Sequence, residues 1–308
     1  MAFQLRPQKS TAHELRRLAR KALGSARDAL VRFDPPREEA IHSARKSVKK
    51  VRAILQLIDA DDGRGLSDSE ERLRTVNRTL SRLRDADAMI ETFDKLRRDH
   101  PELFSEHVYA RVRRQLASRK QAVVRDGVKD GSWKKAAREL RSLRKRAKRW
   151  RPAHDGFDTL APGIRQTHRR ARKALARATR QNAADNFHEL RKELKTLWYE
   201  VRLVGAGTAA IGRDIRALHS AEVWLGDDHN LVVLCAELSK DPSVCRSPLD
   251  TQRLQCAVNT SQRRLRQRAI ARTRLIVSAK PRDYVRRVER AWNARQQAAR
   301  HPAKRRAA

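Results

Sequence analysis

Cysteine and long apolar runs are both scarce in this 308-residue sequence. The three cysteines, Cys235, Cys245 and Cys256, are odd in number, and no two have the C-x-x-C spacing of a metal or redox motif. They are typical of free thiols in a reducing compartment rather than of a disulfide framework or a zinc site. No window approaches the roughly 18 apolar residues of a membrane span, and the first residues form no signal peptide. The sequence therefore predicts a cytoplasmic protein that does not enter a membrane.

Residues that interrupt helices are also few, since the chain has only 11 glycines and 10 prolines. Aromatic residues make up 5 %, too few for a broad surface that stacks nucleic-acid bases. Hydrophobic residues amount to 39 %, below the roughly 45–50 % of an average domain. Leucine, isoleucine and valine nevertheless recur at regular intervals, which is not typical of a disordered chain. The length allows one large or two medium domains with a buried core.

Acidic residues are also scarce, since the chain has 36 Asp and Glu but 72 Lys and Arg. The formal net charge is +36 at pH 7. A protein with this excess repels itself and attracts polyanions. The sequence therefore predicts a partner such as nucleic acid, anionic lipid headgroups or inorganic polyphosphate.

The apolar residues follow a helical period. The clearest run steps by three and four residues from Ile41 through Ala44, Val48, Val51 and Leu55 to Ile58, which is typical of a helix in a bundle. Capping signals and prolines mark the ends of further helices. We expect helices from Thr11, whose capping box includes Glu14, to about Phe33; from Asp34-Pro35-Pro36 onward; from Ser67; from Pro101 to near Gly127; and from Ser132 to Trp150.

Segments of the first half recur in the second half in the same order. Arg20-Lys21-Ala22-Leu23 recurs as Arg172-Lys173-Ala174-Leu175, and His42-x-x-Arg45-Lys46-x-x-Lys49 recurs as His188-x-x-Arg191-Lys192-x-x-Lys195. Turn-forming residues after position 150 mark a boundary, which predicts an N-terminal unit 1–150 and a C-terminal unit 151–308 with a basic tail. The expected fold class is all-α, with two homologous four-helix bundles related by a pseudo-twofold axis.

The repeated helices each carry basic residues along one flank. At 100° per residue these side chains lie about 80 to 160° from the apolar seam, on the same side of both helices. Phosphate groups suit such a lining, because they carry charge and acceptor oxygens, while Arg, Lys and His supply donors. If the flanks face each other, they line one basic groove. The candidate binding residues are His42, Arg45, Lys46, Lys49, Lys50 and Arg52 on one helix and His188, Arg191, Lys192, Lys195 and Arg202 on the other, with Arg16, Arg20, Arg169, Arg172 and Lys173 on the walls.

Two acidic patterns have alternative interpretations. Glu39-x-x-His42 and Asp185-x-x-His188 resemble the Glu-x-x-His pairs of di-iron bundles, but first-turn acids are also favoured by the helix dipole. We prefer the second interpretation, because the neighbouring lysines and arginines oppose a cation. The acidic pairs at positions 85 and 87 and at 227 and 228 could hold magnesium, but ion pairs are favoured. Without a phosphate-binding loop or an activated nucleophile, we expect no metal, no cofactor and no catalysis.

These motifs resemble those of the CHAD family, the conserved histidine α-helical domain. The resemblance rests on the two His-x-x-Arg-Lys segments, on Leu80-x-x-x-Arg84-Asp85-x-Asp87 and on Leu225-Gly226-x-x-His229-Asn230, and it extends from about Ser10 to Tyr284. It implies two four-helix bundles around a basic pore that binds inorganic polyphosphate, and an association with polyphosphate granules. Ser81 stands in place of an expected glycine and Asn230 in place of an expected aspartate.

Three functions are compatible with these residues. We favour non-catalytic binding of long-chain polyphosphate between the bundles, in the cytoplasm and at polyphosphate granules. The alternative is non-specific binding of nucleic acid through the basic surface, to which the tail from Arg286 through Arg305 would contribute. A polyphosphate-processing enzyme is the third, and it requires a cluster of metal-holding carboxylates that the sequence does not reveal.

Overall fold

The computed structural model describes residues 3–62, 66–205, 208–241 and 247–300, so Cys245 lies outside the described residues. Those residues form helices without a strand, which confirms the predicted all-α class. The α-helices are α1 (Thr11–Val31), α2 (Glu38–Asp62), α3 (Ser67–Asp99), α4 (Glu106–Asp130), α5 (Ser132–Arg146), α6 (Ala161–Arg180), α7 (Ala184–Gly205), α8 (Ala209–Leu238), α9 (Pro248–Val277) and α10 (Pro281–Arg300), with short 3-10 helices η1 (Pro101–Leu103) and η2 (Ala147–Arg149).

Two helix starts differ from their predicted caps. Ser10, not Thr11, caps α1 by accepting a hydrogen bond from the His13 amide. Glu14 takes no part in a capping box, because its carboxylate binds the guanidinium groups of Arg6 and Arg17. Pro101 begins η1, and α4 starts after Ser105, whose hydroxyl accepts a hydrogen bond from the amide of Val108. In both places a nearby serine is the better cap, since its short side chain reaches the free amides.

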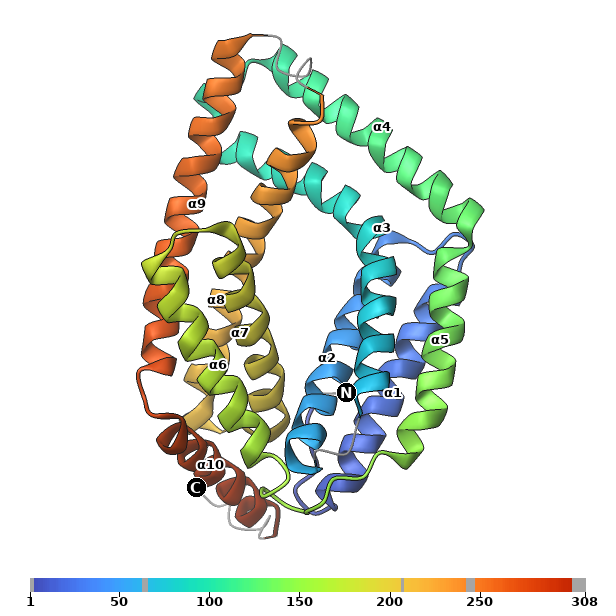
Figure 1. The fold of residues 1–308 in the computed structure, drawn as a ribbon, viewed down its shortest axis with the longest axis vertical. Coiled ribbons are helices and arrows are strands. Elements are labelled where there is room, and N and C mark those ends of the chain that lie inside the picture. Colours follow the sequence, from blue (N-terminus) through green and yellow to red (C-terminus); the bar gives the residue numbers. More distant parts are fainter. Residues whose placement is uncertain (1–2, 63–65, 206–207, 242–246, 301–308) are drawn as a thin grey trace, which may run out of the picture.

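The helices of each half pack mainly with one another. Helices α1, α2, α3 and α5 are in mutual contact, and α6, α7, α8 and α9 form a second group crossed by α10. Figure 1 shows the two groups side by side, with α4 and the ends of α3, α8 and α9 closing the molecule at one end. A separate apolar cluster, which includes Phe93 and Leu234, fills that closed end. The homologous duplication and the division at residue 150 stay predictions.

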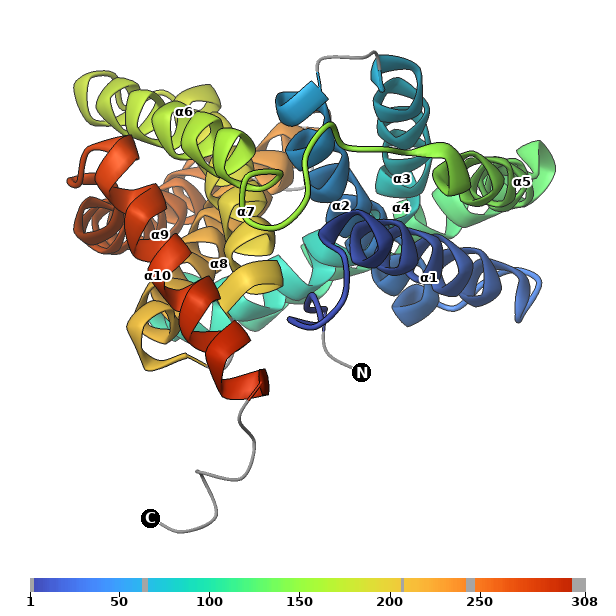
Figure 2. The same ribbon diagram turned by 90° about the horizontal axis from the view of Figure 1, so that it is seen from below.

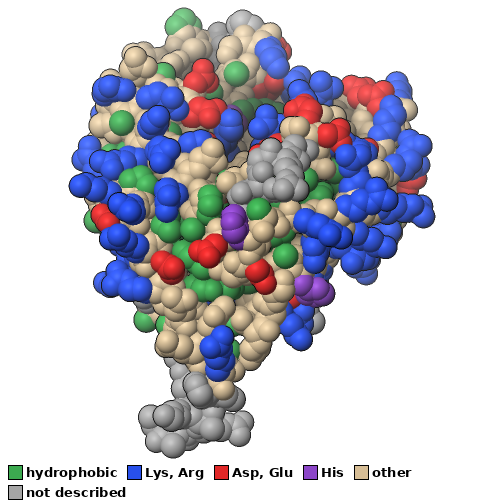
Figure 3. Space-filling view, turned by 60° about the horizontal axis from the view of Figure 1, so that its bottom comes forward, with side chains coloured by type: hydrophobic (Ala, Val, Ile, Leu, Met, Phe, Trp, Pro, Cys, Tyr) green, Lys and Arg blue, Asp and Glu red, His purple; other side chains and the backbone are tan. Residues whose placement is uncertain are grey.

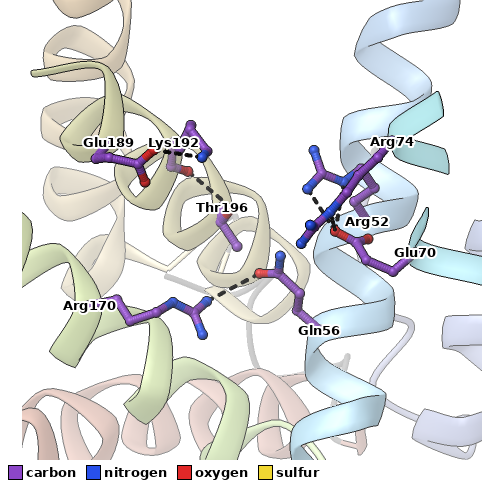
Figure 4. Close-up of polar contacts among 8 residues, drawn as sticks. All are labelled: Arg52, Gln56, Glu70, Arg74, Arg170, Glu189, Lys192 and Thr196. Atoms are coloured by element: carbon purple, nitrogen blue, oxygen red, sulfur yellow. Dashed lines mark hydrogen bonds and ion pairs between the residues drawn. The ribbon is translucent and has the colours of Figure 1, made fainter. Parts of the chain in front are cut away.

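The two halves meet where α2 packs on α6 and α7 (Figure 2). One apolar core contains residues of both halves, such as Leu57 of α2 and Ile164 of α6. The helices approach closely at Gly163, where an added Cβ would lie 2.9 Å from the Cα of Leu57. Nearby, Arg170 donates a hydrogen bond to Gln56 across the same boundary (Figure 4). The halves are therefore joined through α2 as well as through the apolar cluster at the closed end.

Substituting Gly163→Ala should destabilise the protein, because the new methyl group meets backbone atoms that cannot rotate away. We expect a loss of about 1 to 3 kcal/mol in the free energy of unfolding, seen as a lower Tm in thermal unfolding. Gly212→Ala is the matched control, since its Cβ would meet only the flexible end of Arg216 at 3.5 Å. A Gly163→Ala variant as stable as the control would contradict the close approach.

Candidate functional site

Basic side chains of α2 and α7 converge between the two halves. The pKa of Lys49 is lowered well below its ordinary value, by burial first and then by cations on both helices. Those cations are Lys195, Arg45 and Arg191. Because charges act strongly only at short range, the four groups lie together. We call Arg45, Lys49, Arg191 and Lys195 the cationic cluster; the two flanks thus face each other rather than separate solvent.

Burial also affects the other members of the cationic cluster. It lowers the pKa of Arg45, Arg191 and Lys195, although nearby carboxylates act in the opposite direction. All four side chains are half-buried. Such cations have lost part of their hydration without gaining full compensation, and an anion entering the cluster would supply it.

Three histidines surround the cationic cluster, one more than the sequence predicted. The rings of His188 and His229 lie in contact, with centroids 4.2 Å apart. Burial lowers the pKa of His229 to about 4, with further contributions from His188 and the nearby cations. Burial followed by cationic neighbours also lowers the pKa of His42 and of His188. The imidazoles are therefore uncharged at neutral pH in the free protein.

Carboxylates partly neutralise the site. Glu222 of α8 is 4 % exposed and binds the ammonium of Lys195 at 2.7 Å, and Asp85 of α3 lies 3.4 Å from Arg45. The acids that could have held magnesium are engaged in ion pairs: Asp85 with Arg45, Asp87 with Lys120, Asp227 with Lys95 and Asp228 with Arg266. These carboxylates are internal counter-ions of the basic side chains.

Some buried donors of the site lack a hydrogen-bond partner within the described part of the chain. They include Nε of Arg45 and Nε of Arg191, and Nδ1 of His188 is also unpartnered. Buried polar atoms are nearly always satisfied in folded proteins. The two guanidinium Nε donors therefore remain without an acceptor among the described residues.

Gly226 of α8 gives Arg191 its space. A Cβ at this position would lie 3.0 Å from one terminal nitrogen of Arg191 and 3.4 Å from its Cζ. A Cβ on Gly226 would therefore require the guanidinium to shift by a few tenths of an ångström. The sequence contained this glycine in a motif, but its contact with α7 depends on how the helices pack.

Other predicted residues lie at the edge of the cationic cluster or are paired with acids. Lys46 and Arg202 lower the pKa of Lys50 after burial, so these three charges are neighbours. The Arg202 guanidinium also lies 4.5 Å from the centre of the Trp198 ring. The remaining two bind carboxylates, as Figure 4 shows: Arg52 binds Glu70 at 2.7 Å and Lys192 binds Glu189 at 2.8 Å.

The predicted wall residues are not joined to the cationic cluster by any contact among the described residues. Arg16 donates a hydrogen bond to the carbonyl of Trp150. The charge of Arg172 adds to burial in lowering the pKa of His168 on the same helix. The His168 ring contacts Tyr284 of α10 and forms a hydrogen bond with the Ile276 carbonyl of α9. A role in lining the groove stays a prediction for Arg16, Arg20, Arg169, Arg172 and Lys173.

Among the described residues, no three His, Cys, Asp or Glu side chains gather as metal ligands would. In the same ranges, no helix has the length and apolarity needed to cross a bilayer.

A sequence profile of the CHAD domain matches residues 18–239. The fold is similar to the crystal structure of the CHAD domain from the plant Ricinus communis, with a TM-score of 0.56, 17 % identity and coverage of 86 % of this chain and 92 % of that chain. It is also similar to PptA from Streptomyces chartreusis, with a TM-score of 0.60, 17 % identity and coverage of 92 % and 100 %. No curated protein sequence matches.

Proposed function

Since the chain belongs to the CHAD domain family, we propose that it binds long-chain inorganic polyphosphate in a groove between α2 and α7. The observation that carries this proposal is the cationic cluster, in which two helices from different halves bring four half-buried cations together. Polyphosphate offers a repeated negative charge and acceptor oxygens at every unit. It thereby matches a site that holds donors and positive charge in excess.

Bound polyphosphate would supply the hydrogen-bond acceptors and the negative charge that the free site lacks. Phosphate oxygens would accept hydrogen bonds from the unpartnered Nε groups of Arg45 and Arg191. Lys49, which has no carboxylate within hydrogen-bond distance among the described residues, would gain a counter-charge. His42, His188 and His229 would become donors when protonated beside the anion.

We infer binding without catalysis. The two carboxylates nearest to the cationic cluster, Asp85 and Glu222, are held by Arg45 and Lys195. In that position they act as counter-ions of Arg45 and Lys195. The protein would hold polyphosphate in the cytoplasm and at polyphosphate granules, which labelling the protein in cells with and without polyphosphate synthesis would test.

Displacement of labelled long-chain polyphosphate tests the proposed site. Unlabelled polyphosphate should compete, whereas duplex DNA at equal phosphate concentration should leave most of the labelled chain bound. If about eight phosphates are neutralised, the logarithm of the affinity should fall with the logarithm of salt concentration at a slope of roughly −5 to −6. Displacement by DNA as efficient as by polyphosphate would refute the proposal, and so would a slope near −1.

Gly226→Ala separates stability from binding. In the middle of α8, alanine should stabilise the helix by up to about 1 kcal/mol. The added methyl group nevertheless crowds Arg191 at 3.0 Å, so we expect polyphosphate affinity to fall about three- to tenfold. Gly212→Ala on the same helix should leave affinity unchanged. Thermal unfolding and polyphosphate titration measure the two effects; an unaltered affinity would show that Arg191 needs no such space.

A further inference from the structure

The outer face of the first half carries a second concentration of positive charge. Ten of the residues between 134 and 151 are exposed lysines or arginines, and the one acid among them, Glu139, is bonded to Arg72. Figure 3 shows Lys and Arg side chains crowding the right-hand edge of the molecule, where Figure 1 places α5. Within the described structure, eight of the ten have no acidic partner, and we call six of these the α5 patch: Lys135, Arg138, Arg141, Lys145, Lys148 and Arg149.

Packing holds the α5 patch in place on a rigid support. Trp133, Leu140 and Leu143 on the opposite face of α5 are buried, and α5 packs on α1 and α3. Like charges three and four residues apart repel each other, and no acid among the described residues forms an ion pair with a residue of the α5 patch. An anionic partner that binds these side chains would relieve the repulsion between them, so the α5 patch is suited to such a partner.

Shape distinguishes between the possible partners. At 100° per residue, the four patch residues within α5 spread over about 120° of its surface. A helix with its side chains is about 10–12 Å wide, close to the roughly 12 Å of the major groove of a nucleic-acid duplex. Cations spread over such an arc can reach phosphates on both strands, whereas a single linear chain would follow one line of them.

Apolar groups argue against two other partners. Trp133 and Trp150, the aromatic residues of this segment, are both buried and cannot stack on single-stranded bases. The apolar face of α5 is inside the core, so it cannot insert into a lipid surface. We propose that the α5 patch binds the phosphate backbone of double-stranded nucleic acid, at a surface separate from the cationic cluster.

The two surfaces lie on different sides of α2. The cationic cluster faces α7, while α5 lies beyond α1 and α3 at the outer edge (Figures 1 and 2). A duplex on the α5 patch would therefore leave the proposed polyphosphate site open. Contacts to phosphates alone carry no base readout, so binding should be independent of sequence.

Matched charge reversals test the proposal. The patch variant replaces Lys135, Arg138, Arg141 and Lys145 by Glu. The control replaces Arg263, Arg272, Arg274 and Lys280 by Glu, which makes the same change in net charge at exposed positions on the opposite half. A third protein, Lys49→Gln with Arg191→Gln, weakens the cationic cluster. Binding of a labelled 20-base-pair duplex is measured by fluorescence anisotropy at several salt concentrations.

We expect the patch variant to lose at least thirtyfold in duplex affinity, and its salt slope to shrink by about 3 to 4 because four phosphate contacts are gone. The control and the cationic-cluster variant should stay within about threefold of the unaltered protein. Equal losses in the patch variant and the control would show diffuse attraction and overturn the proposal. A comparable loss in the cationic-cluster variant would place the duplex at that site instead.

Three further measurements complete the test. Labelled polyphosphate binding, measured on the same proteins, should be retained by the patch variant, so this proposal and the polyphosphate proposal can fail separately. Vesicles with 30 % phosphatidylserine should bind weakly; a patch variant that loses vesicle binding but keeps duplex binding overturns the assignment. Circular dichroism checks the fold, and glutamine at the same four positions should reproduce the loss if glutamate disturbs it.

Discussion

Replacing Arg45, Lys49 and Arg191 together by glutamine is expected to weaken polyphosphate binding several hundredfold. Each cation would otherwise make at least one charge-assisted hydrogen bond to phosphate, so three lost contacts cost about 3 to 4 kcal/mol. Lys195 stays in this variant because its removal would leave buried Glu222 without its partner. Titration with labelled polyphosphate measures the loss.

The control for this variant is an equal change of charge far from the cationic cluster. Arg282, Arg286 and Arg290 of α10 are exposed, and their replacement by glutamine should change affinity by no more than about threefold. A larger loss in the α10 variant would assign polyphosphate to the C-terminal helix. Thermal unfolding of both proteins shows whether either loss arises from unfolding.

Polyphosphate affinity is expected to rise by about 30- to 100-fold between pH 8 and pH 5. In the free protein the pKa values of His42 and His188 are lowered, and that of His229 is about 4. A bound phosphate chain raises these pKa values, because it favours the charged imidazole. By linkage, binding takes up protons and strengthens as the pH falls from the bound towards the free pKa values.

The free energy of unfolding of the free protein should fall as the pH is lowered, whereas polyphosphate affinity rises. In the unfolded chain these imidazoles titrate near about 6.5, above their folded values, so unfolding takes up protons as the pH falls. The stability that they contribute is present above about pH 6.5 and is lost progressively towards the pKa of about 4 of His229. Bound polyphosphate should reduce this loss.

Replacing His42, His188 and His229 by glutamine should weaken the pH dependence of polyphosphate affinity and that of protein stability. Affinity measured across the pH range and calorimetry in buffers of different ionisation enthalpy would record the lost proton uptake. His13 and His107, both exposed and without a contact to the cationic cluster among the described residues, are the control positions whose replacement should change neither profile. A triple variant with an unchanged pH profile would exclude the imidazoles from binding.

Sequence periodicity was sufficient for the orientation of side chains on a single helix. The run from Ile41 to Ile58 correctly placed Val48 and Leu55 in the core and Arg45 and Lys49 on an adjoining flank. The repeated motif then suggested that the flank of α7 belongs with that of α2. Helices α2 and α7 are in contact, and Lys195 lowers the pKa of Lys49, so the two flanks meet at this place.

What periodicity could not supply is the contribution of a third helix. Glu222, Gly226 and His229 lie on α8, and each acts through a contact with α7: an ion pair, a space for a guanidinium and a ring contact. Those contacts depend on the rotation of α8 against α7, which its own sequence pattern does not fix. Arg172 shows the converse: its motif repeats, but among the described residues its charge acts on His168, four residues earlier on α6, and not on a member of the cationic cluster.

One helix serves both the proposed binding face and the junction between the halves. On α2, Arg45 lies about three turns and Lys49 about two turns before Gln56 and Leu57, the residues that α6 packs against. Inserting one residue between Lys49 and Gln56 would rotate the side chains at one end of α2 by about 100° relative to those at the other end. Either the cations of α2 or its contact with α6 would then be displaced. The number of residues between Lys49 and Gln56 is therefore as constrained as their identity.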